Sequence, residues 1–179
     1  MDDYAFAIHE TKTGTVIEHV KDFISEIGIL YMSDFNRKIL MKLIHENELE
    51  FIPLFDCNTY VYVWKKNPIA SKSSVSLQEL EKYPCLTFDQ GKTNSFYFAE
   101  EVFSTYEYKQ TIQVDDRASM LNLMVGLNGY TLCSGIICEE LNGSDYAAVP
   151  LKETEVMTIG YVKRKSIQLS ELAQLYVNE

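Results

Sequence analysis

The repeated alternation of strand-like and helix-like hydrophobic patterns constrains the fold of this 179-residue chain more than any other feature. Residues 27–32 form a short apolar run with no polar face, which predicts a central strand covered on both sides. The apolar side chains in residues 39–44 then recur at helical spacing, and residues 51–55 return to an extended pattern. This rhythm predicts an α/β fold with parallel strands and crossover helices.

Local patterns and helix caps locate the other elements. Alternating large and small apolar residues predict a strand over residues 4–9, and a helical pattern follows over residues 16–24. Pro53 has no N–H to donate, so its strand should lie at a sheet edge or cross between sheets. We expect further strands at 60–64, 85–88, 111–114, 130–133, 146–150 and 156–162, and helices after Ser76, at 98–103, after Asp115 or Asp116, and at 169–177.

The charge balance bears on partners and location. The chain carries 16 basic and 26 acidic residues, a formal net charge of -10, whereas nucleic-acid binding needs clustered Lys and Arg. We therefore expect no DNA binding by this chain alone. No apolar run approaches the roughly 18 residues that span a bilayer, and the first residues lack the basic and apolar regions of a signal peptide. These features predict a cytoplasmic protein without membrane contact.

No combination of residues predicts catalysis, a metal or a cofactor. The three histidines are scattered, with no cysteine or carboxylate at a metal-ligand spacing, and the common nucleophile, phosphate-loop and dinucleotide motifs do not occur. Cys133 and Cys138 would be a redox couple or, more simply, two small buried apolar residues. Helix caps and solvated helix ends explain the paired acids Asp115-Asp116, Glu100-Glu101 and Glu139-Glu140. We expect a non-enzymatic protein with no metal and no cofactor.

Several short strings, in one order and spacing, resemble the regulatory domain of LysR-type transcriptional regulators. They are EIGIL at 26–30, LEFIPLF at 49–55, NPIA at 67–70, VSLQEL at 75–80 and YPCL at 83–86. The resemblance continues through residues 114–116 to Gly126 and into residues 149–151, so it covers nearly the whole chain. Each string alone is a weak match, but together they are specific.

This resemblance implies a periplasmic-binding-protein-like α/β fold, in which two Rossmann-like lobes are joined by two crossover strands. Lobe I would comprise residues 1–56 and 156–179, and lobe II would comprise residues 57–155. The chain would cross near residues 54–57 and 153–158, and a small-molecule effector would bind in the cleft between the lobes. Open parallel sheets collect ligands at the carboxyl ends of their strands, which agrees with this arrangement.

The front of the chain departs from the family. Family members begin with a winged helix-turn-helix and a linker helix, which nothing here resembles. Residues 4–9 match the second strand of lobe I, so we expect the first β-α unit to be missing. The resemblance implies the effector-sensing part of a regulator that forms a homodimer or tetramer and contacts DNA through a head domain not present in this chain.

The resemblance places the effector against loops that follow strands. Residues 10–15 precede a helix whose free N–H groups suit an anionic group such as a carboxylate, and Arg117 would bind a carboxylate at two points. Ordinary caps, core positions and a surface ion pair of Arg117 with Asp115 or Asp116 are the structural alternatives. The candidate ligand-binding residues are Glu10, Thr11, Thr13, Thr15, Tyr31, Ser33, Thr87, Phe88, Asp116, Arg117 and Ser134.

Two other functions use the same two-lobed fold. A solute-binding receptor of a transport system would carry a signal peptide, and four unpaired cysteines also disfavour it. An enzyme on this fold would need a nucleophile or an acid and base in a recognisable set, which the residues do not offer. Effector sensing is therefore the favoured function.

Overall fold

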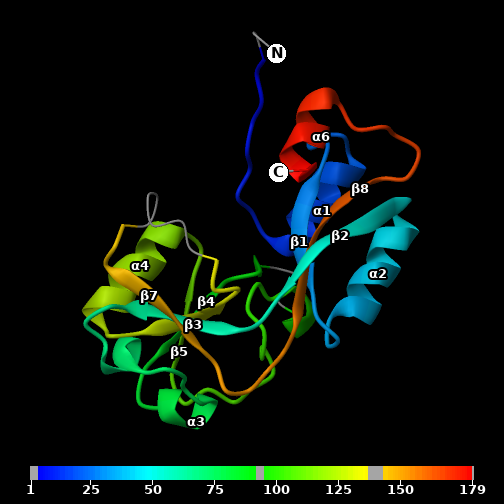
Figure 1. Cartoon of the computed structure of the whole chain (residues 1–179). Helices are drawn as coiled ribbons and strands as arrows, with labels where there is room; N and C mark the ends of the chain where they lie inside the picture. Colours follow the sequence, from blue (N-terminus) through cyan, green and yellow to red (C-terminus); the bar gives the residue numbers. More distant parts are fainter. Residues whose placement is uncertain (1–3, 92–94, 137–142, 179) are drawn as a thin grey trace.

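The chain forms two sheets that lie side by side, each accompanied by helices (Figure 1). A computed structural model describes residues 4–91, 95–136 and 143–178. The first sheet has three strands in the order β1-β8-β2, and the second has five in the order β5-β4-β6-β3-β7. The predicted mixed α/β architecture is therefore confirmed.

In the first sheet, β8 runs antiparallel to both of its neighbours, so β1 and β2 run parallel to each other on either side of it. Helices α1 and α2 pack on this sheet and bury a core that includes Ile17, Leu40, Ile44 and Val162. The elements of this half are α1 (Thr13–Lys21), β1 (Gly28–Met32), α2 (Arg37–Glu46), β2 (Leu49–Cys57), β8 (Met157–Arg164) and α6 (Glu171–Asn178).

In the second sheet, β4 pairs in parallel with β5 and β6, while β3 pairs antiparallel with β6 and β7. The capping box predicted from Ser76 and Glu79 is present at the start of α3. The elements of this half are β3 (Tyr60–Trp64), η1 (Pro68–Ser71), α3 (Leu77–Leu80), β4 (Cys85–Phe88), η3 (Phe96–Phe98), β5 (Thr111–Val114), α4 (Arg117–Gly126), β6 (Tyr130–Cys133) and β7 (Tyr146–Pro150).

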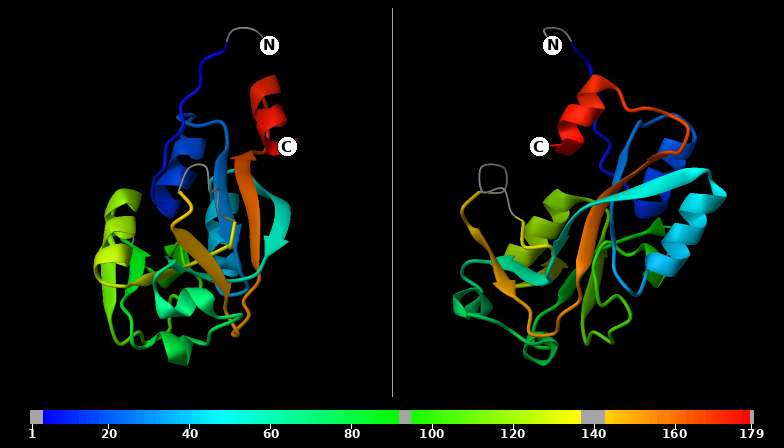
Figure 2. Two further views of the ribbon diagram at one scale, coloured as in Figure 1. Left: turned by 60° about the vertical axis from the view of Figure 1, so that its left-hand side comes forward. Right: turned by 45° about the vertical axis from the view of Figure 1, so that its right-hand side comes forward.

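The chain passes twice between the sheets, from β2 into β3 and from β7 into β8, and Figure 2 shows the two passages together. The Thr59 hydroxyl donates a hydrogen bond of 2.9 Å to the Glu155 carbonyl, which joins one passage to the other. Pro53 lies in β2, at the sheet edge that its missing N–H predicted, and pairs opposite Gly160 beside a register shift. The first half is therefore built from two distant parts of the sequence. The second half is the part of the chain that lies between them.

The strand predicted over residues 4–9 does not form. These residues are extended but belong to no sheet, and they run away from α1 as a tail (Figure 1). Phe6 is 62% exposed and Ile8 is 79% exposed. Alternation gives a strand one apolar face, but a strand also needs a neighbouring backbone, and none of the described strands pairs with this segment.

The strand at residues 27–32 forms as β1, but it is an edge strand and not the predicted central one. Its Leu30 and Met32 are buried in the core of the first half, whereas Ile29 is 41% exposed. Ile29 and Tyr31 line a cavity that faces the second sheet. The strand β1 therefore has no polar face because its second face forms a cavity wall, and not because a second layer of helices covers it.

The prediction of a helix over residues 98–103 is wrong. A short 3-10 helix, η3, ends at Phe98, and turns follow. Phe103 has a φ of 55°, which an α-helix cannot accommodate. Glu101, which was expected at a solvated helix end, is only 5% exposed.

Gly160 allows β2 to approach β8 closely. A Cβ atom at this position would overlap the carbonyl oxygen of Ile52 and the ring of Phe51. We predict that Gly160→Ala lowers the free energy of unfolding by about 2 kcal/mol, because overpacking forces the paired strands apart. Urea unfolding measures the change. Gly126→Ala is the control, since nothing lies near its Cβ position and alanine favours helix; equal destabilisation of both variants would contradict this account.

Candidate functional site

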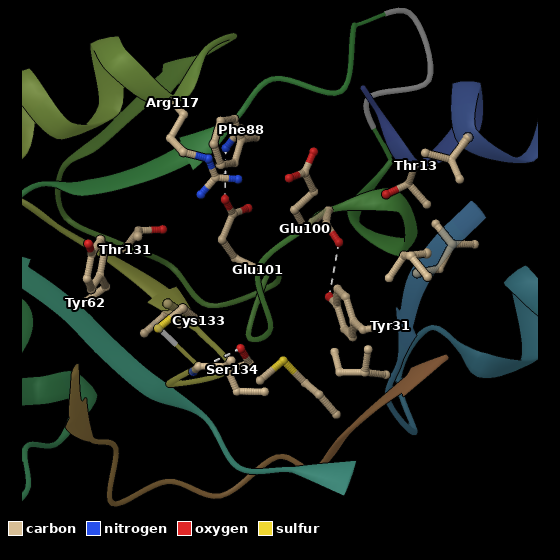
Figure 3. A pocket seen from close by; sticks show the side chains of 18 of the residues that line it. Thr13, Tyr31, Tyr62, Phe88, Glu100, Glu101, Arg117, Thr131, Cys133 and Ser134 are labelled. Carbon is tan, nitrogen blue, oxygen red and sulfur yellow. Dashed lines mark hydrogen bonds between the residues drawn. The ribbon is translucent and has the colours of Figure 1, made fainter. Parts of the chain in front are cut away.

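A cavity of about 450 Å³ opens between the two sheets. Its first wall comes from α1, β1, α2 and β8, and its second wall comes from β3, β4, α4, β6 and the segment that holds Glu100 and Glu101 (Figure 3). This volume lies within the range of about 300–1,000 Å³ that is usual for small-ligand sites. The cavity is the candidate functional site.

Six of the eleven residues that the sequence nominated lie on the cavity wall. Three come from the first half and three from the second: Thr11, Thr13, Tyr31, Phe88, Arg117 and Ser134. The Tyr31 hydroxyl donates a hydrogen bond of 3.1 Å to the Ala99 carbonyl, so it also connects the two walls. These residues remain the leading candidates for ligand contact.

The other five nominated residues are not part of the wall: Glu10, Thr15, Ser33, Thr87 and Asp116. Two of them have clear local roles. The Ser33 N–H donates to the Asn36 side chain at 2.8 Å, next to the start of α2. Asp116 caps α4, because its carboxylate accepts a hydrogen bond of 2.8 Å from the Ser119 N–H. Asp116 therefore fixes the helix end from which Arg117 projects.

Arg117 stands at the mouth of the cavity. Its guanidinium donates a hydrogen bond of 3.0 Å to Glu10 and lies 5.8 Å from the centre of the Phe88 ring. Its ion-pair partner is thus Glu10, and not the neighbouring Asp115 or Asp116 that we considered from the sequence. Glu10 precedes α1 and α4 belongs to the second half, so this pair joins the two halves.

A second ion pair joins the same two regions. The Lys12 ammonium lies 2.8 Å from the Asp89 carboxylate, and this hydrogen bond holds the pKa of Asp89 below its usual value. The Thr13 N–H donates to the Gln90 side chain at 3.3 Å. Residues 10–13 therefore bind to the loop after β4 and to the start of α4, across the mouth of the cavity.

Glu101 is the most unusual group on the wall, and its burial was not foreseen. One carboxylate oxygen accepts a hydrogen bond of 3.0 Å from the Phe88 N–H (Figure 3). Burial raises the pKa of Glu101 to about 8, against the effect of the Phe88 hydrogen bond, and nearby Glu100 raises it further. Glu101 is therefore mainly protonated at neutral pH.

Glu100 lies beside it on the same wall. Its carboxylate accepts a hydrogen bond of 3.2 Å from the Gln90 side chain. Burial also raises the pKa of Glu100, while Gln90 and the positive charge of Arg117 oppose the rise. Adjacent acids are common at solvated helix ends, so the sequence contained no signal that these two would turn inward.

Two buried hydroxyl groups on the second wall lack partners. Tyr62 of β3 and Thr131 of β6 are paired across the sheet, and their exposed fractions are 9% and 6%. Neither hydroxyl has a hydrogen-bond partner within the part of the chain that the structure describes. Burial raises the pKa of Tyr62 to about 12, so its hydroxyl remains a proton donor. Buried polar groups are normally hydrogen-bonded, so two unpartnered hydroxyls at a cavity wall indicate a place for a ligand or a water molecule.

Metal-ligand clusters and membrane-spanning helices are both absent from the described residues. Within residues 4–91, 95–136 and 143–178, no three His, Cys, Asp or Glu side chains gather as metal ligands would. None of the described helices is long and apolar enough to cross a membrane. Cys133 lies on the cavity wall as a free thiol, but Cys138 and the Glu139-Glu140 pair lie outside the described residues.

The raised pKa of Glu101 predicts a specific pH dependence of stability. Between pH 4.5 and 8 the unfolded chain loses this proton while the folded chain keeps it, so this contribution to stability is complete below pH 4.5 and is lost as pH rises through 8. In the unaltered chain, this proton should lower the free energy of unfolding by an amount on the order of 4 kcal/mol as pH rises from 4.5 to 8. We predict that Glu101→Gln removes this decrease. Urea unfolding from pH 4.5 to 8 tests this. Glu107→Gln, at an exposed position, is the control; parallel curves for all three proteins would refute the assignment.

Comparisons with solved structures agree with this architecture. The chain is similar to HinK, a LysR family transcriptional regulator from Pseudomonas aeruginosa, with a TM-score of 0.63, 16% identity and coverage of 95% of this chain and 57% of HinK. The reduced OxyR regulatory domain from Pseudomonas aeruginosa gives a TM-score of 0.64 at 15% identity, covering 95% and 77%. The effector-binding domain of QuiR, in complex with shikimate, gives 0.61 at 16% identity, covering 93% and 75%.

The sequence itself decides the family. No curated protein matches the chain. The family model described as the LysR substrate binding domain, however, matches residues 3–179. Since this match spans nearly the entire sequence and the fold agrees with it, the chain belongs to the LysR substrate-binding domain family.

Proposed function

We propose that the chain senses a small-molecule effector for a LysR-type transcriptional regulator, by binding it in the cavity between the two sheets. The observation that carries this is the cavity itself, which combines a ligand-sized volume with buried polar groups that lack partners. A ligand would supply those partners, and membership of the family supports the assignment. The QuiR domain, which is similar in fold, was solved with shikimate bound.

We further propose how binding is transmitted. The two halves correspond to lobe I, residues 1–56 and 156–179, and lobe II, residues 57–155. A ligand that touches both walls favours one arrangement of the lobes, by no more than its difference in affinity between arrangements. The ion pairs Lys12–Asp89 and Glu10–Arg117 span the mouth, so they would be made or broken as the lobes move.

The remaining parts of the function lie beyond this chain, which spans 57% of HinK. We propose that the protein acts in the cytoplasm as a homodimer or tetramer, and contacts DNA through a separate head domain. The domain would sense its ligand without transforming it. The ligand would carry a carboxylate or similar anionic group, for which Arg117, Thr11 and Thr13 are the candidate partners.

A pair of substitutions tests where the effector binds. Ile29 and Ile39 are similarly exposed, at 41% and 37%, but only Ile29 is part of the cavity wall. We predict that at least one compound in a panel of amino acids, small carboxylates and aromatic acids raises the melting temperature. A ligand at 100 times its Kd stabilises by about 2.7 kcal/mol. Ile29→Trp should abolish this shift, because the indole fills the cavity, and Ile39→Trp should retain it.

Thermal-shift measurements on the three proteins give a clear decision. An undiminished shift in Ile29→Trp would place the binding site elsewhere. If no compound in a broad metabolite panel, sugars and nucleosides included, stabilised the unaltered chain, effector sensing would be the wrong function.

A further inference from the structure

Five of the polar side chains on the second wall of the cavity form two sets of opposite character. Glu100 and Glu101 are acidic groups on one part of the second wall. Tyr62, Thr131 and Arg117 are hydrogen-bond donors on another part. Figure 3 shows Arg117 between Glu101 on one side and Thr131 and Tyr62 on the other. The remaining surface is largely apolar and includes Ile29, Met120, Met157 and Ile159.

On the basis of the proposed effector-binding function, we infer that the effector is a small zwitterion, an amino acid with an apolar side chain. Its ammonium group binds against Glu100 and Glu101, and its carboxylate binds to the hydroxyls of Tyr62 and Thr131 beside Arg117. The apolar side chain lies against the isoleucine and methionine surface.

The acidic set determines the first half of this assignment. Burial raises the pKa of both Glu100 and Glu101, and a simple carboxylate in the cavity would give neither acid a partner of opposite charge. An ammonium group instead gives Glu100 and Glu101 a partner of opposite charge. This pair of acids therefore favours a ligand with a positive group over a purely anionic one, which narrows the class of carboxylate expected from the sequence.

The donor set determines the second half. The Tyr62 and Thr131 hydroxyls are more than nine-tenths buried and unpartnered among the described residues, so a ligand acceptor would satisfy both at once. Arg117 is close enough for its charge to act on both Tyr62 and Glu100. It binds Glu10 at the mouth, and a ligand carboxylate would compete with that carboxylate for the same guanidinium.

The charge state of Glu101 provides an independent readout. Its titratable surroundings are Glu100, Tyr31 of β1, Cys85 of β4 and Tyr108, and burial raises the pKa of each of them. Glu101 holds a proton at pH 7 in the free chain. An ammonium group placed beside it favours the carboxylate, so binding releases that proton to the solvent.

The experiment uses three matched sets of probes. Each set contains an amino acid, the acid without its ammonium group and the amine without its carboxylate, all with the same side chain. They are L-leucine, 4-methylpentanoate and 3-methylbutylamine; L-phenylalanine, 3-phenylpropanoate and phenethylamine; and L-methionine, 4-(methylthio)butanoate and 3-(methylthio)propylamine. Isothermal titration calorimetry at pH 7 gives each Kd. We expect at least one amino acid to bind at least about tenfold more tightly than both of its partial analogues, since each lacks one charged contact.

Two variants test the ammonium contact and the carboxylate contact of the ligand separately. Glu101→Gln should weaken the amino acid and the amine by about tenfold and leave the carboxylic acid unchanged, because it removes the negative charge. Tyr62→Phe should weaken the amino acid and the acid several-fold and leave the amine unchanged, because it removes a donor. Glu107→Gln and Tyr176→Phe are the controls, since both residues are exposed and neither is part of the cavity wall.

Repeating the titration in phosphate and in Tris measures proton release, because the two buffers differ in ionisation enthalpy. We expect between about half and one proton per amino acid, and none in Glu101→Gln. This readout does not depend on the affinity of the variant. Equal heats in both buffers, or a desamino acid that binds as tightly as its amino acid, would overturn the zwitterion assignment. If all nine probes fail while another metabolite stabilises the chain, the effector class is wrong and effector sensing stands.

Discussion

The central position of β8 is the constraint on which the rest of the structure depends. This strand comes from the far end of the sequence, yet it separates β1 from β2 and supplies backbone hydrogen bonds to both. The sheet cannot close until the chain has built the second half and returned. That return brings the second sheet beside the first and creates the cavity between them. Gly160 of β8 makes the close contact with β2 possible.

The cavity is bounded by groups that are unfavourable to bury. An unpaired hydroxyl group in a protein interior costs on the order of 1–3 kcal/mol, and the Tyr62 and Thr131 hydroxyls are buried at this wall without partners among the described residues. Glu101 is buried there with one hydrogen bond, which it accepts from the Phe88 N–H. Packing alone would favour apolar residues at these three positions. Their presence is understandable if a ligand supplies the missing partners, because the unfavourable burial in the free state then becomes affinity and selectivity in the bound state.

The two ion pairs at the mouth have a different role from the groups inside. Lys12–Asp89 and Glu10–Arg117 are substantially exposed, and surface pairs of this kind contribute little to stability. They therefore suit a contact between parts that move relative to each other, since little free energy is lost when they separate. Under the proposed function, the polar groups inside the cavity would provide recognition, while the weak ion pairs would let the mouth open.

The sequence by itself determined the elements whose pattern is local. Strands β3 to β7 and the capping box at Ser76 appear where periodicity and side-chain hydrogen bonding placed them, and the α4 cap falls on Asp116, one of the two aspartates predicted for it. Only the tertiary structure decided which backbones pair and which side chains turn inward. Residues 4–9 alternate like a strand but gain no neighbour, and β1 is apolar on both faces because one of them borders the cavity. Glu100 and Glu101 resemble any solvated pair, since burial depends on contacts with residues far away in the chain.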